Sequence, residues 1–501
     1  MEYLLGLDIG TSGVKAVLID ADGDVVQTDT CSYPLSTPRA GWAEQNPGDW
    51  WEATVEVIGR ILQASKIDSS HLAGISFSGQ MHSSVFLDKN REVIRPAILW
   101  SDTRTSAQCE EIYELVGGLE NLIDMVSNPA LEGFTAPKIL WLRENEPENF
   151  ERVDKVLLPK DYIRFRLTGE LNTEVSDGAG TLLMDVEEKD WSDDILSRLD
   201  IERDMLPPVL GSISVAGRIT GEAAAATGLK AGTPVVAGGA DNACGAVGSG
   251  IVHEGRVMVS IGSSGVVLAQ SDSPVADNQG RIHLFNHSRP DSWYMMGVML
   301  SAGMSYSWLQ ESMYGDRLDF GQLDELAAEV SPGSDGLVFL PYLYGERTPH
   351  ADASARGVFF GISGKHREGH FARSVMEGVT FGLRDSLELI KDKGIEIEEV
   401  RATGGGAKSE IWQQILADIF GEEISLLNVE EGPGFGAALI AGVGVGVFKN
   451  FAEVEREIIE TTKTISPKPD NTERYQKFYQ IYRDLYPALK DNYSNLADLQ
   501  E

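Results

Sequence analysis

A glycine-rich turn occurs twice in this chain, at residues 7–14 (LDIGTSGV) and again at residues 259–266 (VSIGSSGV). Each copy joins two apolar, β-branched runs, which predicts a tight hairpin whose glycines let backbone N–H groups and hydroxyls converge on an anion. One such turn alone is more often a plain hairpin. Because the turn recurs in similar strand contexts, the repeat indicates two related domains that hold a nucleotide between them.

The two copies differ at one position that carries chemistry, where the first has Asp8 and the second has Ser260. A carboxylate beside a phosphate-binding loop repels a triphosphate unless a divalent cation lies between them. Mg²⁺ prefers a carboxylate together with waters and phosphate oxygens. The sequence therefore predicts Asp8 as the anchor of a magnesium ion.

Composition excludes several classes of partner. The 501 residues carry 77 acidic and 42 basic side chains, a formal net charge of −35, so no surplus positive field exists to hold nucleic acid or an anionic membrane. Apolar runs stay below the roughly 18 residues of a membrane span, and the N-terminus has no basic leader. Three cysteines are too few for a disulfide framework. We expect a soluble, cytoplasmic protein of two or three domains with a solvated acidic surface, for which a high-salt cytoplasm is one explanation.

The order of the predicted elements indicates an α/β architecture. Strands are expected at residues 4–9, 14–19 and 25–33, followed by an amphipathic helix that starts at Pro47 and by a strand at residues 72–77. Strands around a turn, followed by alternating helices and strands, are typical of α/β layers. At the other end, residues 468–489 are expected to form a helix with a packing face of Tyr475, Phe478, Tyr479, Tyr482 and Tyr486.

Further glycine clusters support a duplication. Residues 238–248 and 432–442 both continue from glycines into Gly and Ala runs, the composition needed where two helices pass close together. Such a pair is a candidate hinge between domains, and plain tight packing is the alternative. A third cluster, residues 403–409, lies between an expected strand and an expected helix over 411–420, where glycines let adenine or ribose approach the backbone. It has neither P-loop nor dinucleotide spacing.

Two longer motifs carry a family resemblance, one over residues 133–145 (GFTAPKILWLREN) and one within residues 357–377. With these motifs and with residues 8–11 and 404–407, the chain resembles the FGGY carbohydrate kinases, which belong to the sugar kinase, actin and heat-shock chaperone superfamily. The resemblance covers most of the chain, as far as residue 450.

The resemblance implies a fold and a domain division. It implies two actin-like, ribonuclease H-like α/β domains with a cleft for ATP and a sugar between them. The N-terminal domain is then expected over residues 1–246 and the C-terminal domain over 247–450. The helical segment 451–501 is expected to pack back on the domains.

Within that family, residues 80–82 (QMH), 99–104 (LWSDTR) and 239–242 (GADN) are most similar to the xylulokinases. This resemblance implies ATP-dependent transfer of a phosphoryl group to D-xylulose, giving D-xylulose 5-phosphate in D-xylose breakdown. Asp241 is then the general base that takes the proton of the acceptor hydroxyl. A helix N-cap is the alternative role for an Asp at this junction.

The same resemblance implies a set of binding residues. Met81, His82 and Asn242 are expected to line the sugar together with Asp241, whereas a lone His after a strand is otherwise a structural hydrogen-bonding residue. The residues expected to bind ATP are Gly10, Thr11 and Ser12 at the first turn, Gly262 and Ser263 at the second, and Gly303, Gly405, Gly406 and Ala407 around the adenosine.

Two charged residues near these motifs have simpler interpretations. Asp102 is a weaker candidate for the sugar, because it can instead fix its own loop through Arg104. Lys15 lies two residues past the first turn and could reach a phosphate, but it is more simply a lysine on the surface of a strand.

Two other functions stay open on the sequence. A sibling kinase of the same family would act on another ketopentose, a polyol or a deoxy sugar, and the Met81–His82 pair is the feature that favours xylulose. An actin-like ATPase switch would turn over ATP without any sugar and would need neither this pair nor Asp241. The expected partners are a small sugar and ATP with Mg²⁺, and a homodimer is the alternative to a monomer.

Overall fold

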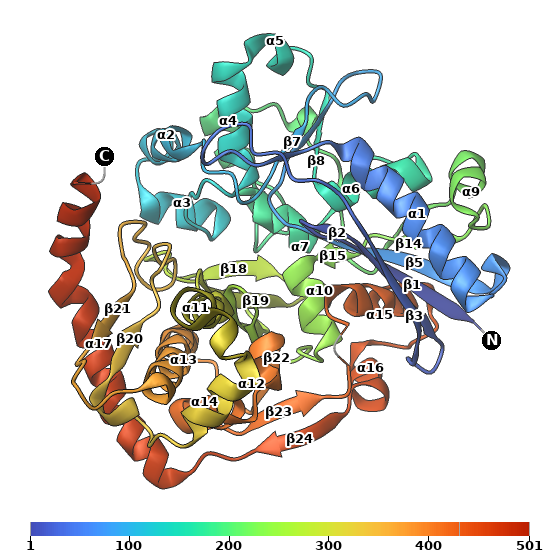
Figure 1. Ribbon diagram of the computed structural model, residues 1–501. Helices are drawn as coiled ribbons and strands as arrows, with labels where there is room; N and C mark the ends of the chain where they lie inside the picture. The colour runs from blue at the N-terminus through green and yellow to red at the C-terminus, as the bar shows by residue number, and fades with distance from the viewer. Residues whose placement is uncertain (1, 430, 500–501) are drawn as a thin grey trace. The chain divides into compact units, whose positions relative to one another are not determined.

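The computed structural model describes residues 2–429 and 431–499. Helices and strands form two compact α/β units, as expected (Figure 1). Unit 1 comprises the described residues of Met1–Val252, Ser271–Tyr294 and Glu431–Glu460, and unit 2 those of His253–Gln270, Met295–Glu430 and Thr461–Glu501. Each unit therefore gathers stretches that are far apart in the sequence. The predicted domain limits at residues 246 and 450 stay a prediction.

Unit 1 is built on a seven-stranded sheet with the order β13-β14-β5-β1-β2-β3, in which β15 also pairs with β5. The first two strands form the hairpin predicted from the glycine turn, and β1 pairs with β5 in parallel on its other side. The strands are β1 (Tyr3–Ile9), β2 (Gly13–Asp20), β3 (Val25–Ser32), β5 (Leu72–Gly79), β13 (Val215–Arg218), β14 (Pro234–Val236) and β15 (Gly239–Ala240). All three predicted N-terminal strands and the strand at 72–77 are confirmed.

The two faces of this sheet are covered by different helices (Figure 1). Leu5 and Leu7 of β1 belong to a core shared with Trp50 of helix α1 (Pro47–Ser65). The alternate residue Gly6 faces helix α15 (Pro433–Val445), where a Cβ atom on Gly6 would lie 2.0 Å from the Gly434 carbonyl oxygen. Because side chains alternate along a strand, Asp8 lies on the same face as Gly6. The first turn thus begins on a face that α15 approaches closely.

The predicted close packing of the Gly/Ala segments is confirmed. Helix α10 (Asp241–Gly248) lies against α15, and a Cβ atom on Gly436 would stand 1.8 Å from the Cys244 carbonyl oxygen. Both helices belong to unit 1, and the chain leaves that unit after Val252, four residues beyond the end of α10.

The remaining elements of unit 1 form its helical layers and short ribbons. Its other helices are α2 (Ser106–Val116), α3 (Leu119–Val126), α4 (Thr135–Asn145), α5 (Pro147–Phe150), α6 (Pro159–Thr168), α7 (Val175–Gly178), α8 (Asp193–Leu199), α9 (Gly221–Thr227) and α16 (Phe451–Ile458). Its short strands are β4 (Glu44–Gln45), β6 (Val85–Leu87), β7 (Ala97–Ile98), β8 (Lys155–Leu157), β9 (Thr173–Glu174), β10 (Met184–Asp185), β11 (Asp190–Trp191), β12 (Val209–Leu210) and β18 (His283–Asn286).

Unit 2 repeats the pattern of a hairpin followed by parallel pairing. Strand β16 pairs antiparallel with β17 across the second glycine turn and in parallel with β22, and the sheet continues through β23 to β24. The strands are β16 (Arg256–Ile261), β17 (Gly265–Ser271), β19 (Trp293–Met299), β20 (Val338–Leu340), β21 (Val358–Phe360), β22 (Glu399–Thr403), β23 (Ile424–Leu427) and β24 (Thr461–Ile465). The last residue of β17 and the first two residues of β19 belong to unit 1. The helices are α11 (Gly303–Leu309), α12 (Phe320–Ala328), α13 (Glu368–Asp392), α14 (Glu410–Phe420) and α17 (Pro469–Asp498).

The C-terminal helix α17 is longer than predicted, because its buried face continues beyond Leu489 to Tyr493. The predicted aromatic face packs within unit 2: the Tyr475 hydroxyl donates to Glu377 (2.6 Å) and the Tyr479 hydroxyl to Asp385 (2.6 Å). Among the described residues, no helix is long and apolar enough to cross a membrane.

Candidate active site

The first glycine turn is closed by backbone and side-chain hydrogen bonds within unit 1. The Gly10 N–H donates to the Gly13 carbonyl (3.1 Å), and the Tyr33 hydroxyl donates to the Gly10 carbonyl. Gly13 has no room for a side chain, because a Cβ atom there would lie 2.6 Å from the Cys31 carbonyl oxygen. The turn is therefore held in one shape before any ligand arrives.

Thr11 at the tip of this turn is fixed by a residue that lies 89 positions away. The Trp100 indole N–H donates to Thr11 Oγ1 (2.9 Å), and the Gln45 amide donates to the Thr11 carbonyl (2.7 Å). Since the hydroxyl oxygen accepts from Trp100, its proton remains directed elsewhere and is suited to donate to an anion. Ser12 beside it is exposed.

Asp8 lies in a row of polar residues across the sheet. Its pairing partners are Lys15 on β2 and Ser78 on β5, and Ser78 in turn pairs with Gly239 on β15. Burial raises the pKa of Asp8, against the opposing effects of the Ser78 hydroxyl and the Lys15 charge. Its Oδ1 atom is buried and accepts no hydrogen bond from the described residues. Such an oxygen is available to a cation.

Asp241 is the first residue of α10 and follows β15 directly. The N-cap of this helix is Ala240, so the N-cap role considered for Asp241 is wrong. The Asp241 Oδ1 atom accepts from the Asn242 backbone N–H (2.7 Å) and from the Asn242 amide (3.0 Å). Asp241 is partly exposed, yet loss of hydration and the nearby Asp8 charge raise its pKa to about 7. Two carboxyl groups of unequal surroundings thus lie near each other, a common arrangement for acid–base work.

The loop after β5 brings two more predicted residues to this region. The Asn242 amide approaches Met81 Sδ (3.7 Å), as does the Tyr294 hydroxyl (4.0 Å). His82 has a positive φ of 68°, and its Nδ1 lies 2.5 Å from the Gly180 carbonyl oxygen. Because a carbonyl only accepts, Nδ1 carries a proton.

Two residues of helix α4 donate hydrogen bonds to the backbone of His82. Its carbonyl accepts from the Thr135 hydroxyl (2.8 Å) and from Lys138 Nζ (3.1 Å). Its ring lies on Phe134, with ring centroids 4.4 Å apart. His82 therefore makes structural contacts and also lies next to Met81 in the chain. A structural role and a role in lining the sugar are compatible.

The two weaker candidates have structural partners. Asp102 is buried and accepts from Arg104 (2.8 and 2.6 Å) and from the Ala43 N–H (2.6 Å), so it fixes its own loop. Lys15 pairs with the Glu431 carboxylate at 2.5 Å.

In unit 2, the second turn is backed by the start of α11. The Gly262 N–H donates to the Ser264 carbonyl (3.0 Å), and the Gly303 N–H donates to the Gly262 carbonyl (2.8 Å). A Cβ atom on Gly303 would lie 2.5 Å from the Gly262 carbonyl oxygen, so only glycine permits this contact. Gly262 and Ser263 are exposed at the tip.

The third glycine cluster adjoins this second turn through Ile261. Gly404 has a φ of 86°, and a Cβ atom on Gly406 would lie 2.4 Å from the Ile261 side chain. Gly405 is exposed with open space around its Cα, while Ala407 is buried. The structure therefore brings the six predicted residues of unit 2 together, with open space beside the backbone at Gly405.

Comparison with known proteins tests the family. Residues 3–248 match the N-terminal domain, and residues 257–445 the C-terminal domain, of the FGGY family of carbohydrate kinases. The chain belongs to this family. The carbohydrate kinase is 44% identical over 491 residues to the xylulose kinase of Bacillus subtilis, which covers 98% of each chain, and 45% identical over 503 residues to that of Lactococcus lactis, which covers 100% of both.

Solved structures agree. The crystal structure of xylulose kinase from Rhodospirillum rubrum has a TM-score of 0.92 to this carbohydrate kinase at 31% identity, covering 98% of this chain and 100% of that chain. The motifs at residues 133–145 and 357–377 therefore identified the family correctly, and the two-domain α/β fold is confirmed.

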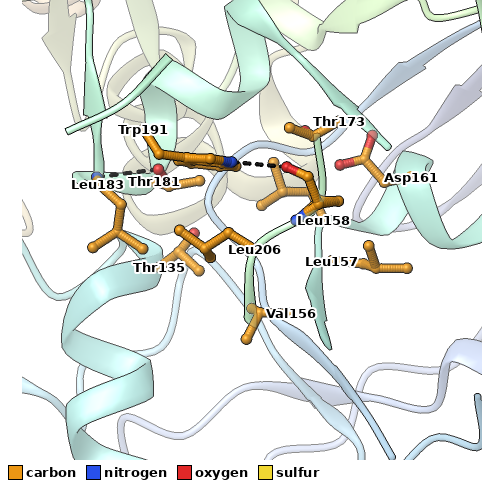
Figure 2. Close-up of a pocket in the computed structure, with 11 residues that line it drawn as sticks. Thr135, Val156, Leu157, Leu158, Asp161, Thr173, Thr181, Leu183, Trp191 and Leu206 are labelled. Carbon is orange, nitrogen blue, oxygen red and sulfur yellow. Dashed lines mark hydrogen bonds between the residues drawn. The ribbon is translucent and has the colours of Figure 1, made fainter. Parts of the chain in front are cut away.

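Sequence reasoning missed a buried charged cluster next to β15, the strand that directly precedes Asp241. It consists of Lys160, Asp161, Glu174 and Asp177, whose side chains are fully buried. Asp161 also borders a cavity of about 10 Å³ in unit 1, where it lies beside Thr173 (Figure 2). Residues of these types are expected at the surface, so composition gave no signal. Among the described residues, no three His, Cys, Asp or Glu side chains form a cluster suited to a metal ion.

Proposed function

We propose that this carbohydrate kinase catalyses the ATP-dependent phosphorylation of D-xylulose to D-xylulose 5-phosphate, with Asp241 as general base. The observation that carries the proposal is the Asp241 carboxyl, whose pKa is raised to about 7 and which accepts a hydrogen bond from Asn242, itself in contact with Met81. The substrate follows from the identities of 44% and 45%, over nearly the whole chain, to proteins named xylulose kinase.

The residues around the sugar have different proposed roles, which follow from their contacts. The Asp241 carboxylate takes the proton of the sugar hydroxyl as that oxygen attacks the γ-phosphorus, forming a new O–P bond while the bond to the ADP oxygen breaks. Asn242 holds one carboxylate oxygen with two hydrogen bonds, which leaves the other for the proton. Met81 and His82 line the sugar.

The phosphate chain is assigned to the two turns. Gly10, Thr11 and Ser12 bind the transferred phosphoryl group, with the Thr11 proton as donor because its oxygen already accepts from Trp100. Gly262 and Ser263 bind the rest of the chain. The open backbone at Gly405, together with Gly406, Ala407 and Gly303, takes the adenosine.

The residues present fit a magnesium ion held mainly by the nucleotide. Asp8 offers a buried carboxylate oxygen that accepts no hydrogen bond from the described residues, and oxygen is the ligand that Mg²⁺ prefers. Asp8 would hold the ion through water. When bound, Mg²⁺ neutralises charge on the phosphate oxygens.

Three further expectations concern the domain limits, the cellular location and the oligomeric state. The folding domains extend over residues 1–246 and 247–450, near the matched family segments 3–248 and 257–445, with 451–501 as a helical segment that packs back on them. The enzyme works in the cytoplasm. A homodimer is the alternative to a monomer, and sedimentation velocity distinguishes the two states.

The test is ADP release from purified protein with Mg²⁺ and ATP against D-xylulose, D-ribulose, L-ribulose, glycerol, gluconate and no sugar, at low and high salt. The proposal predicts stimulation by D-xylulose above all others. A larger response to another sugar would reassign the substrate within the family, and equal turnover without sugar would favour an ATPase switch.

A further inference from the structure

A fully buried lysine in unit 1 binds three carboxyl groups. Lys160 Nζ lies 2.9 Å from Asp161 Oδ1, 3.0 Å from Asp177 Oδ2 and 3.4 Å from Glu174 Oε1. Arg164 adds a second buried cation, with Nη2 2.9 Å from Asp161 Oδ1. Buried charges at this density are costly unless they are paired and hydrogen-bonded.

Burial and the two cations act differently on the carboxyl groups of this cluster. Burial, together with the neighbouring charges of Asp161 and Glu174, raises the pKa of Asp177 despite the opposing charge of Lys160. For Asp161, burial is outweighed by Lys160 and Arg164, which lower its pKa.

Hydrogen bonds from Ser176 to Glu174 connect this serine to the buried cluster. The Glu174 carboxylate accepts from the N–H groups of Ser176 and Asp177 (both 2.8 Å), from the Ser176 hydroxyl (2.9 Å) and from the Ser212 hydroxyl (2.7 Å). The Ser176 hydroxyl therefore points its proton at Glu174, and its oxygen is left to accept.

The Ser176 oxygen accepts from the backbone N–H of Ala240 (2.9 Å), the residue directly before Asp241. The same strand region is tied a second time, because Arg164 Nη1 donates to the Ala237 carbonyl (2.6 Å). Gly239 has no space for a side chain here, since a Cβ atom would lie 2.4 Å from Ser288 Oγ and 3.3 Å from Ser176 Oγ.

We propose that Ser176, held by Glu174 and Lys160, is a positioning residue that fixes the backbone from which Asp241 reaches the acceptor hydroxyl. The proposal rests on the proposed role of Asp241 as base. If the Asp241 carboxylate is displaced by a fraction of an ångström, the enzyme still binds its substrates but transfers the proton less often. We therefore expect kcat to change more than KM.

The experiment compares Ser176→Ala, Ser176→Cys and Ser176→Thr with Ser212→Ala in the full-length enzyme. Ser212→Ala is the matched control, because it removes a donor to the same Glu174 carboxylate without touching Ala240. We expect Ser176→Ala and Ser176→Cys to lower kcat about tenfold with KM for both substrates within about twofold, since neither side chain accepts well. Ser176→Thr keeps the hydroxyl and recovers most of kcat, while Ser212→Ala stays near the wild-type kcat.

Two outcomes overturn the proposal: a wild-type kcat in Ser176→Ala or Ser176→Cys, or an equal loss of kcat in Ser212→Ala. If Ser176→Ala does not fold, Ser176→Cys, of similar size to serine, carries the comparison. Asp241→Asn, measured in parallel, distinguishes a failure of the positioning role of Ser176 from a failure of the role of Asp241 as base. An inactive Asp241→Asn with an unaffected Ser176→Ala leaves the base in place and removes only the positioning role, whereas an active Asp241→Asn removes the base.

Discussion

Gly436 and the Cys244 carbonyl are in direct contact, so that a Cβ atom on Gly436 would stand 1.8 Å from that oxygen. The oxygen belongs to the backbone of α10 and cannot move aside, unlike the end of a flexible side chain. We predict that Gly436→Ala destabilises the protein by about 1–3 kcal/mol or more, as an overpacked core does.

The measurement is chemical denaturation beside Gly59→Ala, a matched control in helix α1. A Cβ atom on Gly59 meets nothing within 4 Å, so Ala there should stabilise by about 0.5–1 kcal/mol. Equal stability of the two variants would contradict the close packing of α10 and α15.

The contact between Trp100 and Thr11 gives a prediction for nucleotide binding. Trp100→Phe removes the indole donor, and the Thr11 hydroxyl is then free to rotate away from the phosphate. A lost neutral hydrogen bond of about 0.5–1.5 kcal/mol corresponds to a rise of about two- to tenfold in KM for ATP. Steady-state kinetics checks this, with Trp51→Phe as a control, because the Trp51 ring packs against Arg166. An unchanged KM would show that the indole does not orient Thr11.

Lys138 gives a prediction for the sugar. It is buried, and it donates to the carbonyls of His82 and Gly133. Burial lowers its pKa to about 7 against the opposing charge of Asp102. Lys138→Met removes one donor to the His82 carbonyl, so the strained His82 backbone is less well fixed. At about pH 6, below this pKa, we expect KM for the sugar to rise about tenfold at constant KM for ATP, the size of one charged hydrogen bond.

Thr135→Val removes another donor and should act in the same direction with a smaller effect, because a neutral hydroxyl is lost. If both variants changed only KM for ATP, the assignment of this loop to the sugar would be wrong.

The pKa of Asp241 predicts a pH profile. The base must be ionised to accept a proton, and burial raises its pKa to about 7. Activity measured as kcat/KM should therefore rise with pH, reach half its limit near pH 7 and level off above it. A profile that is flat down to pH 5 would contradict this assignment.

The contribution of Asp241 to protein stability should fall as pH rises, whereas activity rises. An unfolded Asp ionises near pH 3.9. Between that pH and about 7 the folded protein holds a proton that the unfolded chain has lost, so this group's contribution to stability falls as pH rises. Asp241→Asn has no charge to bury, and it should raise Tm at pH 8 while leaving it near the wild-type value at pH 4.

Local patterns in the sequence were sufficient for the hairpins and for the strand-to-helix junction at Asp241. Glycines and β-branched runs act over a few residues, and the turn at Gly10 forms between adjacent strands. The Gly/Ala composition of α10 and α15 likewise predicted their packing without showing which residues touch.

Contacts over long sequence separations were not predictable in this way. Trp100 reaches Thr11 across 89 positions, and no local pattern states which loop covers a turn. Lys160 follows a short strand and looks like a surface lysine, yet its side chain is fully buried. Each compact unit also joins stretches that are far apart in the sequence, through contacts within that unit.

The central claim is that Asp241 removes the proton of the acceptor hydroxyl, and the most direct measurement is kcat of Asp241→Asn with D-xylulose, beside Asn242→Ala. The account predicts a loss of about 10³-fold in Asp241→Asn, in the range for a lost general base, with KM for ATP little changed. It predicts a smaller loss in Asn242→Ala, which keeps the carboxylate. An Asp241→Asn enzyme that retains more than about a tenth of the wild-type kcat would contradict the claim.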